Sequence, residues 1–228
     1  MATKKYYAVL KGKKTGIFDT WEDCKKLVQG FSGAVYKSFK TLEEAEDYLA
    51  CGSAASSVKF VDGLPVGPYA FVDGSFNAEM GVYGFGGFLV KDNERHPLYG
   101  CGFDLAWASM RNVAGETTGA MAAVELALEL GLDRLTILYD YQGIEAWVTG
   151  AWEAKNACTK AYRDNMRAAS EKLDIQFKKV KGHSGIAGNE LADAIAKFAV
   201  GNPLSEKQLL AVRDVLGDEA FFDEACAS

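Results

Sequence analysis

Three strand-like segments that stand close together, followed by alternating helices and strands, constrain the fold of this chain most strongly. The segments YAFVDGS (69–75), VYGFGGFLV (82–90) and PLYGCGF (97–103) are apolar, rich in β-forming residues and interrupted by glycine. Short connections join them, which favours antiparallel pairing. The pattern therefore predicts that these segments form one side of a single sheet.

The sequence after residue 110 alternates between helical and strand-like patterns. Apolar residues recur at helical spacing in 113–131, 161–173 and 189–200, and strand-like runs stand at 135–140 and 175–182. Antiparallel strands followed by this alternation predict an α/β fold, with a mixed five-stranded sheet and helices packed on it.

The N-terminal region predicts a separate, small α+β domain. Its strand-like runs are residues 4–10, 17–21 and 34–39. Helical patterns begin after Thr20 and Thr41, and Asp23 and Glu44 stand three residues later, as in a capping box. The predicted order of elements is β-β-α-β-α.

Charge is distributed unevenly between the two regions. Residues 1–40 contain nine lysines against three acidic residues, a net charge of +6, whereas the whole chain carries −6, so the remainder carries −12. An acidic chain of this kind does not coat nucleic acid along its whole length. A basic N-terminal region followed by an acidic remainder instead indicates an anion-binding module attached to a second module.

Composition predicts four segments along the chain. We expect a small domain at 1–51, a linker at 52–67 that contains GSAASS, a larger domain at 68–200, and an acidic C-terminal extension at 201–228. The extension contains the amphipathic stretch LLAVRDVLGDEAFF, for which the sequence predicts packing or partial disorder and indicates no role.

The five cysteines and the apolar runs bear on location. The cysteines are scattered and no C-x-x-C occurs, which predicts reduced thiols and neither a zinc site nor a disulfide framework. The first residues contain no apolar leader, and no apolar run reaches 18 residues. The sequence therefore predicts a cytoplasmic protein without a membrane partner, and it leaves the oligomeric state open.

Four acidic residues are placed where such a fold could bring them together. Asp73 and Asp140 end strand-like runs, and Glu116 and Asp193 lie in helical segments. If the strands pair and the helices pack across them, the four carboxylates can meet at one edge of the sheet. Such hard oxygen ligands suit Mg²⁺. A pair of these ions can clamp the attacking and leaving oxygens of a phosphodiester.

The order of motifs in residues 68–200 resembles type-1 ribonuclease H. DGS follows the first strand, a glutamate comes early in the first long helix, an aspartate follows the fourth strand, and VKGHSG and NELAD come near the end. The most specific element is the last, in which His183 and Asp193 lie ten residues apart. The resemblance implies an endonuclease that hydrolyses the RNA strand of RNA–DNA hybrids with two Mg²⁺ ions, or Mn²⁺ in their place, and leaves 5′-phosphate and 3′-hydroxyl ends.

The resemblance also implies roles for individual residues. Asp73 would bridge both ions, Glu116 and Asp140 would complete the shell of one, and Asp193 would bind the other. His183, on a loop with glycines on both sides, would shuttle a proton or help to release product.

The implied substrate contacts fall on both strands of the hybrid. Asn112, Asn189 and the backbone near Gly74 and Ser75 would contact the RNA strand, partly through its 2′-hydroxyl groups. Trp147 and Trp152 would flank the DNA strand. Some family members carry a basic protrusion after the helix that follows strand four, whereas the corresponding stretch here, WVTGAWEAKNACTKAY, is short and nearly neutral. The larger domain alone should therefore bind weakly, because phosphate neutralisation dominates affinity.

The N-terminal region resembles the hybrid-binding, or viroplasmin-like, domain of the same family. The matching pieces are YYAV, KGKKTGIF, TWEDC and VYKSF. The resemblance implies that Tyr7, Trp21, Tyr36 and Lys37 grip an RNA–DNA hybrid, with double-stranded RNA as a second duplex that this domain could bind. The chain departs from the family at Ser38, where a second lysine is common.

Two alternatives remain open from the sequence. One is a hybrid- or duplex-binding protein whose nuclease fold is inactive, although the intact set of carboxylates argues against it. The other is a different nuclease, or an integrase-like phosphotransferase of the same fold. Such enzymes act on DNA and usually lack the histidine loop at this spacing.

Overall fold

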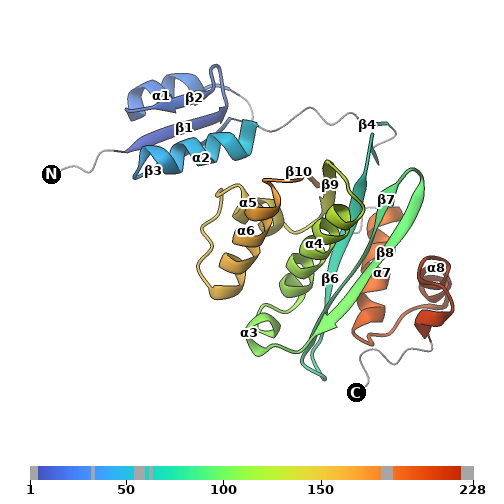
Figure 1. Cartoon of the computed structure of the whole chain (residues 1–228). Helices are drawn as coiled ribbons and strands as arrows, with labels where there is room; N and C mark the ends of the chain where they lie inside the picture. Colours follow the sequence, from blue (N-terminus) through green and yellow to red (C-terminus); the bar gives the residue numbers. More distant parts are fainter. Residues whose placement is uncertain (1–4, 32–33, 54–59, 62–63, 181–186, 222–228) are drawn as a thin grey trace. The chain divides into compact units, whose positions relative to one another are not determined.

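The computed structural model describes residues 5–31, 34–53, 60–61, 64–180 and 187–221 (Figure 1). The chain forms two compact units: one comprises Met1–Ser57 together with Thr149–Trp152, and the other comprises Val58–Val148 and Glu153–Ser228. Each unit has its own sheet and its own apolar core.

The small unit has the predicted β-β-α-β-α order. Its elements are β1 (Tyr6–Lys11), β2 (Gly16–Phe18), α1 (Trp21–Val28), β3 (Val35–Phe39) and α2 (Leu42–Ser53). The three strands pair antiparallel in the order β2-β1-β3. The prediction of a small α+β domain is confirmed.

Both helices of the small unit begin at the predicted threonine caps. The Thr20 hydroxyl oxygen accepts a hydrogen bond from the backbone N–H of Asp23 at 3.2 Å. The Thr41 hydroxyl oxygen accepts one from the N–H of Glu44 at 3.2 Å, and the Glu44 carboxylate accepts one from the N–H of Thr41 in return. These bonds satisfy backbone donors that a helix start leaves without intrahelical partners.

The larger unit contains a mixed five-stranded sheet in the order β10-β9-β6-β7-β8. Its strands are β6 (Tyr69–Asn77), β7 (Val82–Lys91), β8 (Glu94–Gly102), β9 (Arg134–Tyr139) and β10 (Asp174–Lys179). β6, β7 and β8 pair antiparallel, and β9 pairs parallel with both β6 and β10. The predicted fold class is confirmed.

The stretch predicted as a linker contains further short elements. β4 (Phe60–Val61) and β5 (Leu64–Pro65) pair as a small hairpin, and α2 continues to Ser53. The four predicted segment boundaries remain predictions.

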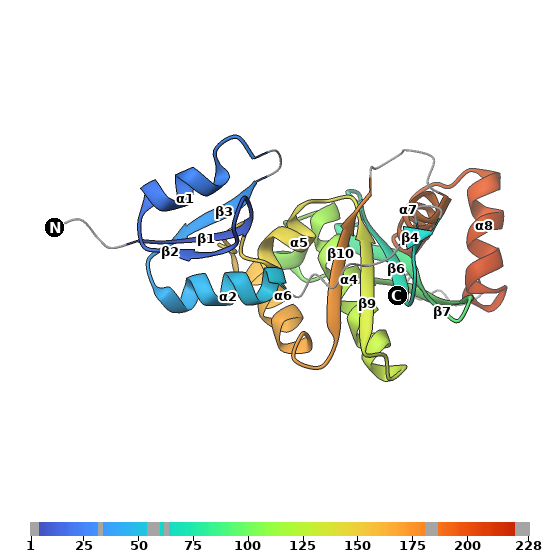
Figure 2. The ribbon, with the colours of Figure 1, turned by 90° about the horizontal axis from the view of Figure 1, so that it is seen from above.

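Helices cover both faces of the larger sheet (Figure 2). They are α3 (Leu105–Ala108), α4 (Asn112–Glu129), α5 (Gly143–Val148), α6 (Ala157–Ala169), α7 (Ala187–Ala199), α8 (Glu206–Leu216) and the short 3₁₀ helix η1 (Glu219–Phe221). One core joins α4, α5 and α6 to side chains such as Val72, and the other joins α7 and α8 to side chains such as Phe71. Val72 and Phe71 face opposite sides because successive strand residues alternate.

Two glycines let helices approach β6 and β7 closely. A Cβ atom on Gly74 would lie 2.2 Å from the carbonyl oxygen of Asn112, at the start of α4. A Cβ atom on Gly86 would lie 2.0 Å from the backbone nitrogen of Ala196, in α7. α4 and α7 therefore rest against the strand backbone from opposite faces, which brings their acidic residues close to β6.

The C-terminal extension packs onto the larger unit as far as it is described. Val212 of α8 is fully buried in the core shared with α7, and the Phe198 and Phe221 rings lie 4.8 Å apart. Ser205 and Gln208 form a capping box that starts α8. This agrees with the packing that the amphipathic pattern predicted.

The cysteines follow the prediction only in part. Cys24 and Cys158 are free and buried, and burial raises the pKa of each thiol. Cys101, on β8, is disulfide-bonded, so the prediction of reduced thiols is wrong at this position. A scattered spacing does not report which cysteines the fold brings together.

A membrane span requires a helix that is both long and apolar. Within the described ranges, no helix meets both conditions. The cytoplasmic location remains a prediction.

Candidate active site

The larger sheet opens where β6 and β9 part. Their pairing ends with Phe71 opposite Leu138, and Asp73 and Asp140 each stand two residues further along. Because the two strands are parallel, both carboxylates lie at the same edge. Asp73 shares the α7 face with Phe71, since strand side chains alternate, whereas Asp140 stands one residue past the end of β9. Asp73 lies inside β6, which continues to Asn77, rather than at the strand end that the sequence predicted.

Glu116 joins these two aspartates from the other face of the sheet. It is the fifth residue of α4, and only 5% of it is exposed. The carboxylate oxygens that Asp73, Glu116 and Asp140 offer all lie within 4.8 Å of one another. We call these three residues the carboxylate triad.

Burial and like charge make the triad electrostatically costly. Burial, and then the negative charge of Asp140, raise the pKa of Asp73 to about 7. Hydrogen bonds from the Gly74 N–H, at 2.7 Å, and from the Glu116 side chain oppose this rise. Burial and the charges of Asp73 and Asp140 hold the pKa of Glu116 well above its usual range. Carboxyl groups this close and this buried do not ionise together without a compensating cation.

The triad fits a hard divalent cation. The Oε2 atom of Glu116 is buried and has no hydrogen-bond partner, which is costly for a carboxylate unless an ion completes its environment. The three residues also supply only oxygen ligands, as Mg²⁺ and related ions prefer. They are therefore the residues that would hold a metal ion.

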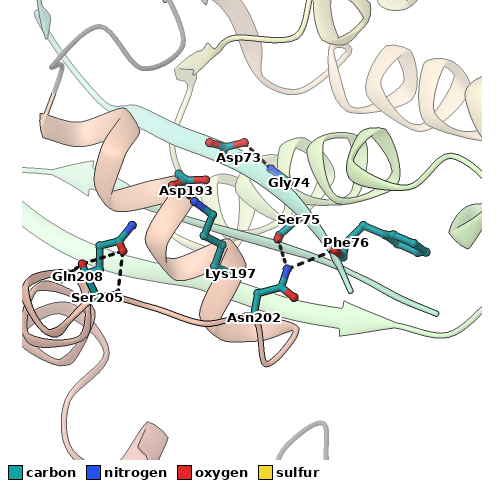
Figure 3. A network of polar contacts seen from close by, with 9 residues as sticks. All are labelled: Asp73, Gly74, Ser75, Phe76, Asp193, Lys197, Asn202, Ser205 and Gln208. Carbon is teal, nitrogen blue, oxygen red and sulfur yellow. Dashed lines mark hydrogen bonds and ion pairs between the residues drawn. The ribbon is translucent and has the colours of Figure 1, made fainter. Parts of the chain in front are cut away.

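Asp193 is not part of the triad, and Figure 3 shows it on α7 near Asp73 of β6. It projects from α7, and its carboxylate accepts a hydrogen bond from Lys197 Nζ at 2.7 Å, an ion pair one helical turn apart. Its negative charge also contributes to the raised pKa of Asp73. The sequence analysis missed Lys197, although an aspartate and a lysine four residues apart on a helix are a known pairing signal.

The raised pKa of Asp73 predicts an unusual pH dependence of stability without metal. The folded chain holds this proton up to about pH 7, whereas the unfolded chain loses it near 3.8. Between these values the folded state binds more protons, so the free energy of unfolding falls as pH rises. In thermal melts with EDTA, we expect the melting temperature to fall by about 3 °C or more between pH 5 and pH 8 through this group.

The Asp73→Asn variant is the control, because it removes the titrating group while keeping its shape. Acids outside the triad titrate alike in both chains, and the pKa of Glu116 is raised less in the variant because the charge of Asp73 is gone, so the melting temperature of the unmodified chain relative to the variant should fall as pH rises. A constant difference from pH 5 to pH 8 would contradict the raised pKa. Adding Mg²⁺ should stabilise the unmodified chain more at pH 8 than at pH 6, since metal ligands must be deprotonated.

The structure describes only one of two further site residues that the C-terminal motif predicted. His183 lies outside the described residues. Asn189 lies on α7, one helical turn before Asp193, and is only 4% exposed; its Oδ1 atom is buried without a hydrogen-bond partner.

The residues predicted to contact RNA surround the start of α4 and the exit of β6. Asn112 is the exposed first residue of α4, and Gly74 lies directly against it. Ser75 is buried, and its hydroxyl oxygen accepts a hydrogen bond from the side chain of Asn202 at 3.0 Å (Figure 3). The sequence analysis assigned no role to Asn202, which follows α7.

The two predicted tryptophan contacts differ in exposure. Trp147 lies in α5, is 8% exposed, and packs between Tyr141 and Tyr162 in the core. Trp152 is 43% exposed. A ring as buried as Trp147 offers little surface to a nucleic-acid strand, whereas Trp152 is accessible.

The small unit brings its three predicted aromatic residues together. The Trp21 ring lies 5.7 Å from both the Tyr7 and the Tyr36 rings, and Trp21 and Tyr36 are exposed. Lys37 does not join them. It is paired with Ala8, which faces α2, whereas Tyr36 is paired with Val9, which faces α1. Ser38, paired with Tyr7, occupies the aromatic face instead.

Two family patterns match the sequence. The pattern described as "Ribonuclease H1 N-terminal domain" matches residues 5–49, and the pattern described as "RNase H" matches residues 68–200. The second match covers more than half of the chain, and it contains the carboxylate triad, Asp193 and His183.

The chain is also similar to individual proteins. Ribonuclease H1 of Homo sapiens is 24% identical over 254 residues, which covers 84% of this chain and 88% of the human protein. Ribonuclease H of Crithidia fasciculata is 49% identical over 57 residues, which covers 25% of this chain and only 12% of that protein. The crystal structure of RNase H1 from Halobacterium salinarum covers 59% of this chain at 25% identity, with a TM-score of 0.48.

Proposed function

The chain belongs to the ribonuclease H family, whose members are hydrolases acting on RNA in hybrids, and we propose that it hydrolyses the RNA strand of RNA–DNA hybrids as an endonuclease. The observation that carries the proposal is the carboxylate triad inside the matched region. Three crowded carboxylates, of which Asp73 and Glu116 are buried and Asp140 is half-buried, suit a metal-dependent reaction at phosphorus.

Two Mg²⁺ ions, with Mn²⁺ as a substitute, would supply charge stabilisation at the attacking and leaving oxygens of the scissile phosphodiester. In this proposal Asp73 would help to hold both ions, since it lies on the central strand β6. Glu116 and Asp140 would hold one ion with it, and Asp193 would hold the other. The products would carry 5′-phosphate and 3′-hydroxyl ends.

The chain's own residues fix the geometry of this reaction. Gly74 donates its backbone N–H to Asp73 and so orients the central carboxylate. Lys197 neutralises Asp193 within α7 and would release it when another cation takes up its charge. Gly74 lies against Asn112 and is followed by Ser75, and we assign these three residues contacts to 2′-hydroxyl groups, which distinguish RNA from DNA. Asn189 and Trp152 are further candidates for the RNA and DNA strands.

The small unit would supply affinity that the acidic larger unit lacks. Its aromatic cluster presents the exposed rings of Trp21 and Tyr36, and residues 5–40 contain eight lysines against three acidic residues. Tethering such a unit raises the local concentration of hybrid at the triad. Double-stranded RNA is a second duplex that this unit could hold.

Cleavage of a matched set of duplexes tests this function. RNA–DNA hybrid, double-stranded RNA and double-stranded DNA of one sequence are incubated with the chain in Mg²⁺. We expect cuts in the RNA strand of the hybrid alone. Binding without cleavage would support the alternative of an inactive hybrid-binding protein, and cleavage of double-stranded DNA would support a different nuclease of the same fold.

His183 should assist the reaction without being essential. We propose that it moves a proton or helps product to leave, so His183→Ala should slow steady-state turnover by about 10- to 100-fold and leave residual Mg²⁺-dependent cleavage. Steady-state rates between pH 6 and pH 9 measure this. If the variant is as inactive as Asp73→Asn at every pH, His183 holds a metal ion or the fold instead.

A further inference from the structure

A groove of about 550 Å³ lies directly beside Asp193, between α7, α8 and the β7–β8 pair. Asp193 and Lys197 line it from α7, and Lys207 and Gln208 line it from α8. Arg95 of β8 closes the remaining side, with its guanidinium 5.4 Å from the centre of the Phe88 ring. The groove therefore begins at Asp193, one of the four acids of the proposed active site.

The wall formed by α8 is a feature of this chain that lies outside the matched family region. The family pattern ends at residue 200, and α8 begins at Glu206. Packing nevertheless fixes this wall. Val212 is buried against α7, and the side chain of Asn202 donates hydrogen bonds to the Ser75 hydroxyl at 3.0 Å and the Phe76 carbonyl at 3.2 Å (Figure 3).

The charges in the groove suit an anion. Lys197 is engaged by Asp193, so Arg95 and Lys207 are the cations left to a ligand, against one acid, Glu190. A net positive groove is notable on a chain whose overall charge is −6. The stacking of Arg95 on Phe88 holds the guanidinium plane while leaving N–H donors, the arrangement that favours phosphate binding.

We propose that this groove binds backbone phosphates of the RNA strand next to the cleaved bond, with Arg95 and Lys207 as the contacts. The proposal rests on the proposed function. If Asp193 helps to hold the scissile phosphate of the RNA strand, a groove that starts at Asp193 receives the neighbouring phosphates of that strand. The C-terminal extension then positions substrate at the catalytic unit.

Single-turnover cleavage by the full, active chain tests the groove, because it reports only hybrid bound at the triad. We expect Lys207→Gln and Arg95→Gln each to raise the concentration for half-maximal rate about fivefold, with the maximal rate changed less than about twofold. Glu190→Gln should lower that concentration, since it removes repulsion. Lys172→Gln, the same change at an exposed lysine outside the groove, should have no effect.

A methylphosphonate scan identifies the strand. One uncharged linkage at a time replaces a phosphate of the RNA or the DNA strand. With the unmodified chain, we expect an uncharged linkage at one or two RNA positions next to the cut to raise the concentration for half-maximal rate. With Lys207→Gln, the same linkages should have no effect. The proposal would be overturned if only uncharged DNA linkages raised the concentration for half-maximal rate. It would also be overturned if Lys207→Gln and Arg95→Gln both left that concentration unchanged. If the unmodified chain does not cut the hybrid, the proposed function itself fails.

Discussion

Replacing Asp73 by asparagine should abolish cleavage of RNA–DNA hybrid while hybrid binding is retained. Asparagine keeps the shape of this side chain, which is 8% exposed, but removes a negative charge that the proposed function places between two cations. We expect the single-turnover rate in Mg²⁺ to fall by at least about a thousandfold. Binding should be equal or tighter, because repulsion of the phosphates is reduced.

The control for this variant is Asp133→Asn, the same chemical change at the opposite end of β9. The Asp133 side chain is exposed, and its ion pair with Arg134 is long, at 3.9 Å. This variant should cleave at the unmodified rate. Asp73→Asn should also melt no lower than the unmodified chain at pH 8 in EDTA, since it relieves crowding of buried acids. A wild-type rate for Asp73→Asn would show that Asp73 does not hold the ions.

Deleting residues 1–52 should separate binding from chemistry. The remaining unit is acidic, whereas residues 1–40 carry +6. We expect the Michaelis constant for hybrid to rise about tenfold or more, and the maximal single-turnover rate to change less than about twofold. The slope of the logarithm of the binding constant against the logarithm of the salt concentration should become shallower. We expect a change of about 0.9 for each phosphate that the truncated chain no longer neutralises. Titration of an Asp73→Asn chain and its truncated form with hybrid across a salt series measures this.

Point variants divide this effect between the two faces of the small sheet. Trp21→Ala removes the central ring of the aromatic cluster, and Lys37→Ala removes a charge from the other face, so each should reproduce part of the loss in affinity. Ser38→Lys adds a cation on the aromatic face and should tighten binding. Equal affinities and equal salt slopes for the full and truncated chains would show that the small unit does not hold the substrate.

Local rules predicted most elements of both units. Threonine caps, alternating strand patterns and helical spacing depend on neighbours in the sequence, so Thr20, Thr41 and the strands β6 to β10 could be predicted. The short helices α3 and α5 were missed, because four to six residues are too few to establish a helical period.

Details of the site that depend on strand register and on packing were harder to predict from the sequence. Asp73 lies within β6 because β7 continues to pair with it after β9 departs, and no local pattern reports where a neighbour leaves. The burial of Trp147 depends on Tyr162, fifteen residues away on another helix. Lys37 is different: neighbours in a strand face opposite sides, so its separation from Tyr36 was predictable and was overlooked.

The most direct test of the central claim follows the metal and the product ends together. The chain is treated with EDTA, given hybrid labelled in the RNA strand, and then supplied with Mg²⁺. We predict no cleavage before Mg²⁺ and, after it, cuts only in RNA that leave 5′-phosphate and 3′-hydroxyl ends. Attack by the 2′-hydroxyl instead of water would leave a cyclic phosphate. Cleavage in EDTA, or cyclic phosphate ends, would contradict metal-dependent hydrolysis at the carboxylate triad.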